Sequence, residues 1–193
     1  IHESCGTAQP LLSASIRASS TADGHAVLLR ANLGAPGELA LARRAGCDGC
    51  GLLRSELLFA GRLRAPTVEE QAQSYARVAQ AMAPGPTVVR LFDPSSDKPL
   101  PFLASPVDER EPALGPRGLR LLLAHPEVLA EQLEAIRQAR LNTGRDLRAL
   151  IPMVVDASEV SAVRRLADPG LPLGAMIETP SAALLAESIA RRA

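Results

Sequence analysis

The sequence repeats one pattern, in which a short apolar run ends in a charged or polar side chain. Residues 51–59 show it best: the apolar run ends at Arg54 and Glu56, after which apolar residues resume. Buried strands of parallel sheets are typically near-continuous apolar runs with polar groups where the chain leaves the sheet. The same change recurs at Asn32, Arg90 and Glu178. The pattern therefore predicts several buried parallel strands whose ends carry polar side chains.

Helix signals alternate with these strands. Thr67 and Glu70 have the spacing of a capping box, and Gly46 and Gly144 stand where helices are expected to end. The predicted strands cover residues 26–31, 51–59, 87–92, 148–154 and 173–177. Helices are expected over residues 36–44, 67–82, 156–166 and from 179 onward, and two more are expected to start at 116 and 125.

The order of these elements limits the fold. Strict alternation of strands and helices implies a parallel sheet with right-handed crossovers, which a doubly wound sheet and a (β/α) barrel both satisfy. The dinucleotide-binding pattern G-x-G-x-x-G is absent after the first strand. Polar residues at the ends of several different strands are how barrel enzymes build their sites. We therefore expect an α/β fold of the (β/α)8 TIM-barrel type that is incomplete, with about five of the eight β/α units.

The composition excludes several classes of protein. Apolar residues make up 47% of the chain but aromatic residues only 2%, so the core must be built from Leu, Ala, Val and Ile. Twenty-one basic residues balance 21 acidic ones, which leaves no electrostatic footprint for a nucleic acid. No apolar run is long enough to span a membrane, and the first residues lack the pattern of a secretory signal. We therefore expect neither nucleic-acid binding nor membrane insertion.

The domain proper is expected over residues 25–193. Residues 1–24 are rich in Ser, Ala and Thr without sustained periodicity, which indicates a linker or a remnant of expression. Residues 93–115 contain five prolines and no helix or strand signal. Irregular loops of this length in compact domains are usually functional or disordered.

Cys47 and Cys50 form a C-x-x-C pair, for which two interpretations are open. Zinc needs about four ligands, and no second Cys or His pair stands at suitable spacing. The odd total of three cysteines does not suggest a disulfide framework. Two largely buried thiols in a helix-to-strand turn are the favoured interpretation, and a redox role is the alternative.

The polar strand ends suggest a site for a small phosphorylated acid. Arg54 and Arg90 would share a pocket if their strands are neighbours, and each guanidinium can bind an oxyanion through two parallel hydrogen bonds. Lys98 and Arg117, in or after the long loop, would add positive charge. Glu178 would serve as a Mg²⁺ ligand, since Mg²⁺ favours one or two carboxylates plus substrate oxygens.

A simpler interpretation stays open beside this one. An Arg at a strand end is most often solvated or ion-paired. In that case nearby carboxylates would do no more than neutralise the arginines. The candidates for that role are Glu56, Asp93 and Asp97.

Several motifs in one order carry a resemblance to a known family. The chain resembles the C-terminal phosphoenolpyruvate-binding barrel of enzyme I of the bacterial sugar phosphotransferase system, over about residues 23–193. The Pro-Thr-x-Glu-Glu-Gln stretch at 66–71 favours enzyme I over pyruvate phosphate dikinase and phosphoenolpyruvate synthase. The remaining motifs lie at residues 23–34, 51–59, 89–93, 97–98, 114–120 and 177–180.

This resemblance implies a cytoplasmic phosphoenolpyruvate-protein phosphotransferase that serves sugar uptake. Its magnesium-dependent reaction would transfer the phosphoryl group to a histidine on a separate N-terminal domain and then to the carrier HPr, in a protein that is a homodimer at full length. By the same resemblance Arg54 and Arg90 bind phosphoenolpyruvate, and Glu178 is a magnesium ligand. Lys98 and Arg117 match charged positions near the phosphate.

The chain also departs from the family pattern. Ser95 and Ser96 stand where the family usually has two glycines, and Glu111 stands where it has an Asn. The family's second metal ligand, its proton-donating cysteine and its phosphorylated histidine have no counterpart, so no catalytic residue is assigned and this chain alone is expected to be inactive. Two hypotheses remain: part of a phosphoryl-transfer enzyme, or a non-catalytic module that keeps the scaffold for binding or assembly.

Overall fold

The computed structural model of the chain describes residues 19–35, 37–94, 100–103 and 115–193. Its centre is a five-stranded sheet in which every neighbouring pair of strands is parallel. The strands are β3 (Ala31–Leu33), β4 (Cys50–Arg54), β5 (Thr87–Arg90), β6 (Leu147–Ile151) and β7 (Leu173–Ala175).

The strands of this sheet lie side by side in chain order, β3-β4-β5-β6-β7. A doubly wound sheet reverses its strand order at a switch point, and these five strands show no reversal. The described residues therefore form an α/β structure with a parallel sheet, which is consistent with part of a barrel.

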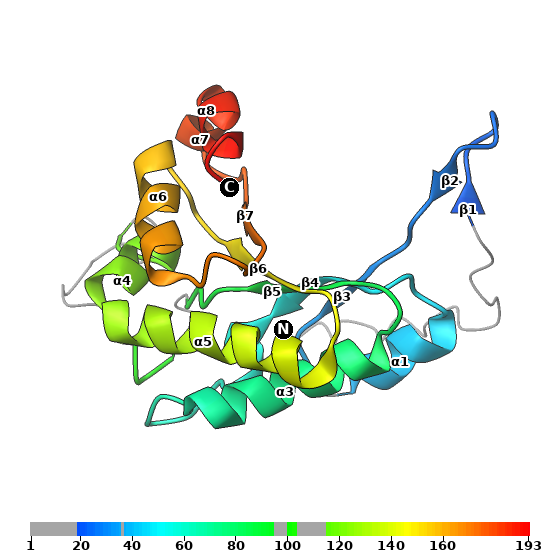
Figure 1. The fold of residues 1–193 in the computed structure, drawn as a ribbon, viewed down its shortest axis with the longest axis horizontal. Helices are drawn as coiled ribbons and strands as arrows, with labels where there is room; N and C mark the ends of the chain where they lie inside the picture. Colours follow the sequence, from blue (N-terminus) through cyan, green and yellow to red (C-terminus); the bar gives the residue numbers. More distant parts are fainter. Residues whose placement is uncertain (1–18, 36, 95–99, 104–114) are drawn as a thin grey trace, which may run out of the picture.

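Helices connect the strands. Figure 1 shows that α1, α3 and α5 lie together along one side of the sheet, while α6, α7 and α8 follow the end that carries β7. The helices before residue 95 are α1 (Glu38–Ala45), α2 (Ser55–Leu58) and α3 (Val68–Ala81). Those after residue 115 are α4 (Gly118–Ala124), α5 (Pro126–Thr143), α6 (Ala157–Leu166), α7 (Pro180–Leu184) and α8 (Ala186–Ala190).

The core lies between the sheet and these helices. Leu53, Val89 and Ala149 are at most 1% exposed, whereas Leu52 and Val88, on the opposite face of the pleat, are only half-buried. Aliphatic side chains dominate the core, as the composition requires. The few aromatic side chains gather in edge-to-face contacts that link Tyr75, Phe59, Phe92 and Phe102.

Helix ends follow the predicted signals. Helix α1 ends at Gly46, which takes the left-handed conformation and donates its N–H to the carbonyls of Ala42 and Arg43. Thr67 accepts from the Glu70 N–H at 3.2 Å while the Glu70 carboxylate accepts from the Thr67 N–H at 2.8 Å, so the predicted capping box is confirmed.

Several predicted elements differ from the structure only in their end residues, and three need a larger correction. The strand predicted over residues 26–31 is two strands, because Leu29 is instead tied to Asp48 by backbone and side-chain hydrogen bonds of 2.7 Å. Residues 55–58 turn into α2 directly after β4 instead of continuing the strand. The helix predicted from residue 179 onward is interrupted at Leu185 and becomes α7 and α8.

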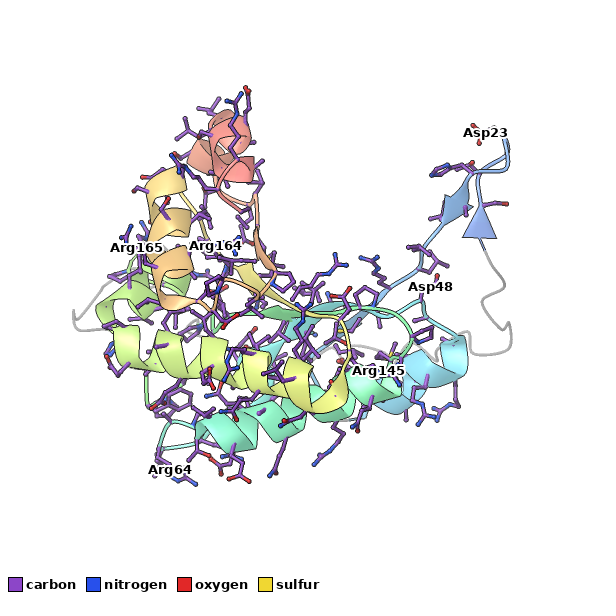
Figure 2. The ribbon with its side chains drawn as sticks, viewed as in Figure 1. Asp23, Asp48, Arg64, Arg145, Arg164 and Arg165 are labelled. Carbon is purple, nitrogen blue, oxygen red and sulfur yellow. The ribbon has the colours of Figure 1, made fainter. Side chains whose placement is uncertain are left out.

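A hairpin of β1 (Ser19–Ser20) and β2 (Ala26–Val27) projects from the sheet. The Gly24 N–H donates to the Thr21 carbonyl at 2.9 Å, so the turn predicted at Asp23-Gly24 is present. Figure 2 shows Asp23 at the tip of the hairpin and Asp48 near its base. The hairpin therefore stands apart from the strand ends that carry the candidate site.

Cys47 and Cys50 carry free thiols; Cys50 is the buried first residue of β4, and the half-buried Cys47 lies in the turn before it. Burial raises the pKa of the Cys50 thiol to about 12, so this thiol stays protonated and poorly nucleophilic at neutral pH. This environment favours the interpretation of packed thiols over a redox role. Among the described helices, none is long and apolar enough to cross a membrane.

Candidate phosphate-binding site at the strand ends

Arg54 and Arg90 are the last residues of neighbouring strands β4 and β5 and stand opposite each other in the register of the sheet. Residues paired in this way project from the same face of a sheet. Two like charges at paired positions repel each other unless counter-charges lie close by. The predicted neighbourhood of Arg54 and Arg90 is therefore present, and its charges need compensation.

Arg90 receives this compensation from two buried carboxylates. Its Nη2 contacts the Glu56 Oε1, and its Nη1 lies 3.8 Å from the Asp93 Oδ2. The side chains of Glu56 and Asp93 are 0% and 4% exposed, and that of Arg90 is 11% exposed. The guanidinium is therefore held between two acids in a largely water-free setting, where charge interactions are strong.

Asp93 also holds Arg117. The Nε and Nη2 of Arg117 donate to the two oxygens of the Asp93 carboxylate at 3.2 and 2.9 Å, the paired geometry that a guanidinium and a carboxylate favour. Arg117 precedes α4 as its N-terminal capping residue and is not inside the helix. Asp93 thus lies between Arg90 and Arg117 and fixes one against the other.

Arg54 has no such counter-ion in contact. Among the described residues, its guanidinium makes no hydrogen bond or ion pair, and its Nε is buried without a partner. The side chain passes close to Gly34, where an added Cβ would lie 3.0 Å from the Arg54 Nε. The positive charge of Arg54 also acts on Glu38. The pKa of Glu38 is lowered mainly by hydrogen bonds from the Ala35 and Gly34 N–H groups, and further by the charge of Arg54.

Glu178 follows β7 and joins the same edge of the sheet. Its Oε1 accepts a hydrogen bond from the Met153 N–H at 2.7 Å, and Met153 adopts a positive φ of 56°. Gly118 packs against the same residue: a Cβ at Gly118 would lie 2.7 Å from the Met153 Cβ and 3.3 Å from the Asp93 Oδ1. Met153 therefore links Glu178 to the segment that carries Arg117.

The structure brings four of the five predicted site residues to the carboxyl ends of the strands, namely Arg54, Arg90, Arg117 and Glu178. Lys98 lies outside the described residues, as do Asp97, Ser95, Ser96 and Glu111. The neutralising role considered for Glu56 and Asp93 is present at Arg90, so those acids belong to the site as partners of the arginines. Met153 was not predicted, because no feature of its neighbours in the sequence marks it.

Comparison with known families identifies the family of this chain. Residues 13–193 match the family described as "PEP-utilising enzyme, PEP-binding domain", where PEP is phosphoenolpyruvate. The chain belongs to this family. The resemblance seen in the sequence motifs is therefore confirmed over nearly the whole chain.

The relatives of this chain carry two names. The chain is 44% identical to the phosphoenolpyruvate-protein phosphotransferase of Streptomyces coelicolor, over 92% of this chain and 33% of that protein. It is 38% identical to the enzyme of the same name from Staphylococcus carnosus, over 90% and 32% of the two chains. It is also 38% identical to the multiphosphoryl transfer protein of Xanthomonas campestris, over 91% and 22%. The chain thus spans about a third or less of the length of these relatives.

Proposed function

We propose that this chain is the phosphoenolpyruvate-binding part of a phosphoenolpyruvate-protein phosphotransferase. The observation that carries the proposal is the pair Arg54 and Arg90, two arginines whose Cα atoms stand in register at the ends of adjacent strands. Arg90 is committed to two carboxylates, but Arg54 makes no hydrogen bond or ion pair within the described residues. An anionic ligand at this edge would relieve the repulsion and satisfy the Arg54 donors.

The arrangement of charges suits a ligand with a phosphate and a carboxylate. Glu56 and Asp93 hold Arg90 and Arg117 in fixed orientations before any ligand arrives, so little side-chain entropy is lost on binding. Preorganised guanidinium groups stabilise negative charge that develops during transfer of a phosphoryl group. In this account Arg54, Arg90 and Arg117 bind the substrate and orient its phosphate.

Glu178 is proposed as a Mg²⁺ ligand. Its Oε1 is fixed by the Met153 N–H, while its Oε2 has no hydrogen-bond partner among the described residues, so one oxygen of an exposed carboxylate remains for a cation. The described residues contain no cluster of three or more His, Cys, Asp or Glu that would hold a metal by themselves. This fits a cation that takes one or two carboxylates and completes its shell with water and substrate oxygens. When bound, Mg²⁺ would neutralise charge on the phosphoryl group and on the enolate that remains.

The sheet and the relatives extend the proposal to the whole protein. We propose that the five parallel strands are part of a (β/α)8 barrel, which places sites at the carboxyl ends of its strands. The phosphoryl group would pass to a histidine on an N-terminal domain, then to HPr for sugar uptake, in a homodimer. The relative named a multiphosphoryl transfer protein supports a second possibility, in which this chain is part of a multiphosphoryl transfer protein.

Turnover in the complete protein tests the proposal. Arg90→Ala is expected to reduce pyruvate release from phosphoenolpyruvate by about a thousandfold, because it removes a guanidinium that stabilises the negative charge on the transferred phosphoryl group. Arg44→Ala is the matched control, because Arg44 is an exposed arginine in the last turn of α1. Equal rates for the two variants would remove Arg90 from the site and refute the proposal.

A further inference from the structure

A buried hydrogen-bond network of uncharged side chains lies directly beneath the strand ends. Its centre is Gln132, a fully buried glutamine on α5. Glutamine is mostly found at protein surfaces, and a buried carboxamide must satisfy both its amide nitrogen and its oxygen. Gln132 satisfies both with groups from α2, from α3 and from the segment that follows β5.

The oxygen of Gln132 holds the backbone that follows β5. Its Oε1 accepts a hydrogen bond from the Phe92 N–H at 3.0 Å. Phe92 lies two residues after Arg90 and one before Asp93, the two residues whose side chains form the charged chain of the site. This bond therefore fixes the path of the chain between them.

The nitrogen of Gln132 holds the same segment from the other side. Its Nε2 donates to the Ser55 Oγ at 2.9 Å, and the Ser55 Oγ donates to the Arg90 carbonyl at 2.6 Å. Ser55 directly follows Arg54, so one side chain connects the ends of both strands. The main-chain groups on each side of Leu91 are thus fixed, directly or through Ser55, by one carboxamide.

A third bond joins this centre to α3 without reaching the site. The Gln132 Nε2 also donates to the Tyr75 Oη at 3.1 Å, and Tyr75 donates in turn to the Gln71 Oε1 at 3.1 Å. Ser55, Tyr75 and Gln71 are at most 1% exposed. The network is therefore fully buried, with one branch to the strand ends and one to the helix layer.

We propose that Gln132 is a positioning residue that sets the places of Arg90 and Asp93, and through Asp93 that of Arg117, for the binding of phosphoenolpyruvate. The inference rests on the proposed function, because it takes those arginines as the ligands of the phosphoryl or carboxylate group. It adds a residue that touches neither substrate nor metal. Its branch to Ser55 and Phe92 controls the site, whereas its branch to Tyr75 contributes to stability alone.

The two branches provide a matched test in the complete protein, with phosphoenolpyruvate titrated in the presence of excess Mg²⁺. Gln132→Leu keeps a similar volume but removes both branches, and we expect its Kd to rise about tenfold or more. Ser55→Ala removes the hydrogen bond to the Arg90 carbonyl and the acceptor of the Gln132 Nε2 but leaves the bond to the Phe92 N–H, so we expect a smaller rise of about threefold. Tyr75→Phe removes only the stability branch, so its unfolding midpoint should fall while its Kd stays within about twofold of the starting protein.

The comparison separates positioning from general destabilisation. If the Kd of Tyr75→Phe rises together with that of Gln132→Leu in proportion to the loss in unfolding midpoint, the positioning role is refuted. If Gln132→Leu does not fold, the Kd values and unfolding midpoints of Ser55→Ala and Tyr75→Phe are compared instead. A Kd that rises in both variants in proportion to the loss in unfolding midpoint would refute the positioning role. Arg90→Ala is included in the same titration. A normal Kd there would refute the proposed function itself, whereas a large loss beside a normal Kd in Gln132→Leu and Ser55→Ala would refute only the inference about Gln132.

Discussion

The Glu178 Oε1 accepts a hydrogen bond from the Met153 N–H at 2.7 Å, which fastens the carboxylate after β7 to the loop after β6. This bond leaves the Glu178 carboxylate negatively charged and fixes its orientation at the carboxyl ends of the strands. Glu178→Gln keeps an oxygen that can accept the same bond but removes the charge that a cation needs. Comparing Glu178→Gln with the starting protein therefore separates a structural role of Glu178 from a metal-binding one.

We expect Glu178→Gln to abolish the dependence of phosphoenolpyruvate binding on Mg²⁺ while leaving the unfolding midpoint unchanged. The measurement is a titration of phosphoenolpyruvate with and without Mg²⁺. Glu187→Gln is the control, because Glu187 is an exposed residue of α8 whose carboxylate pairs with Arg191. An equal response to Mg²⁺ in both variants would exclude Glu178 as the ligand.

The buried pair of Glu56 and Arg90 predicts a loss of stability when its charge balance is broken. Removing one partner of a buried ion pair leaves the other charge uncompensated, so Glu56→Gln should lower the free energy of unfolding by about 3 kcal/mol. Urea denaturation followed by circular dichroism measures this difference. Glu187→Gln again serves as control, since breaking an exposed pair changes little. Equal midpoints would show that Glu56 and Arg90 are not held together in solution.

Gly118 and Gly144 form a natural pair for testing the close approach to Met153. Both adopt positive φ angles, 53° and 61°, so Ala at either position costs about 1 kcal/mol in backbone strain. A Cβ at Gly144 meets nothing within 4 Å, whereas one at Gly118 would lie 2.7 Å from the Met153 Cβ.

Gly118→Ala is therefore expected to be about 1–3 kcal/mol less stable than Gly144→Ala, from the added overlap. It should also weaken phosphoenolpyruvate binding, because the displaced segment carries Arg117. Thermal unfolding and ligand titration of the two variants measure both effects. If the two variants behave alike, Met153 and Gly118 are not in contact.

The capping box of α3 predicts a specific dependence on pH. The pKa of Glu70 is lowered to about 2 by the hydrogen bond from the Thr67 N–H, and then by Arg62 and Arg64. A lowered folded-state pKa means that its stabilising contribution is complete above the unfolded value near 4.5 and is lost as pH falls towards 2. Other acids titrate in the same range, so the comparison must be with Glu70→Gln.

The unfolding midpoint of the starting protein should exceed that of Glu70→Gln at neutral pH, and the gap should narrow as pH falls from 4.5 towards 2. Circular dichroism melts across this range measure the gap. A difference between the two proteins that is independent of pH would contradict an ionised Glu70 in the cap.

Much of the fold could be predicted from local sequence signals, because those signals act within a few residues. Gly46 and the Thr67–Glu70 pair mark helix ends through bonds that span four residues or fewer, and both predictions are confirmed. The polar residues at the strand ends were found for a similar reason, since a parallel sheet brings all such ends to one edge.

The parts that failed depend on partners that are distant in sequence. The segment over 26–31 divides because Leu29 bonds to Asp48. Gln132 could not be recognised either, since it bonds to Ser55 across 77 residues and to Tyr75 across 57. Nothing in the local sequence around Leu185 signals the break between α7 and α8.

Arg54 and Arg90 are proposed to bind phosphoenolpyruvate together at the ends of β4 and β5. Isothermal titration of phosphoenolpyruvate into the complete protein in excess Mg²⁺ tests it most directly, with Arg54→Ala and Arg44→Ala compared. We expect the Kd of Arg54→Ala to rise about 30-fold or more, because this variant loses a charge-assisted bidentate contact. The Kd of Arg44→Ala should be unchanged. An unchanged Kd for Arg54→Ala would contradict the account.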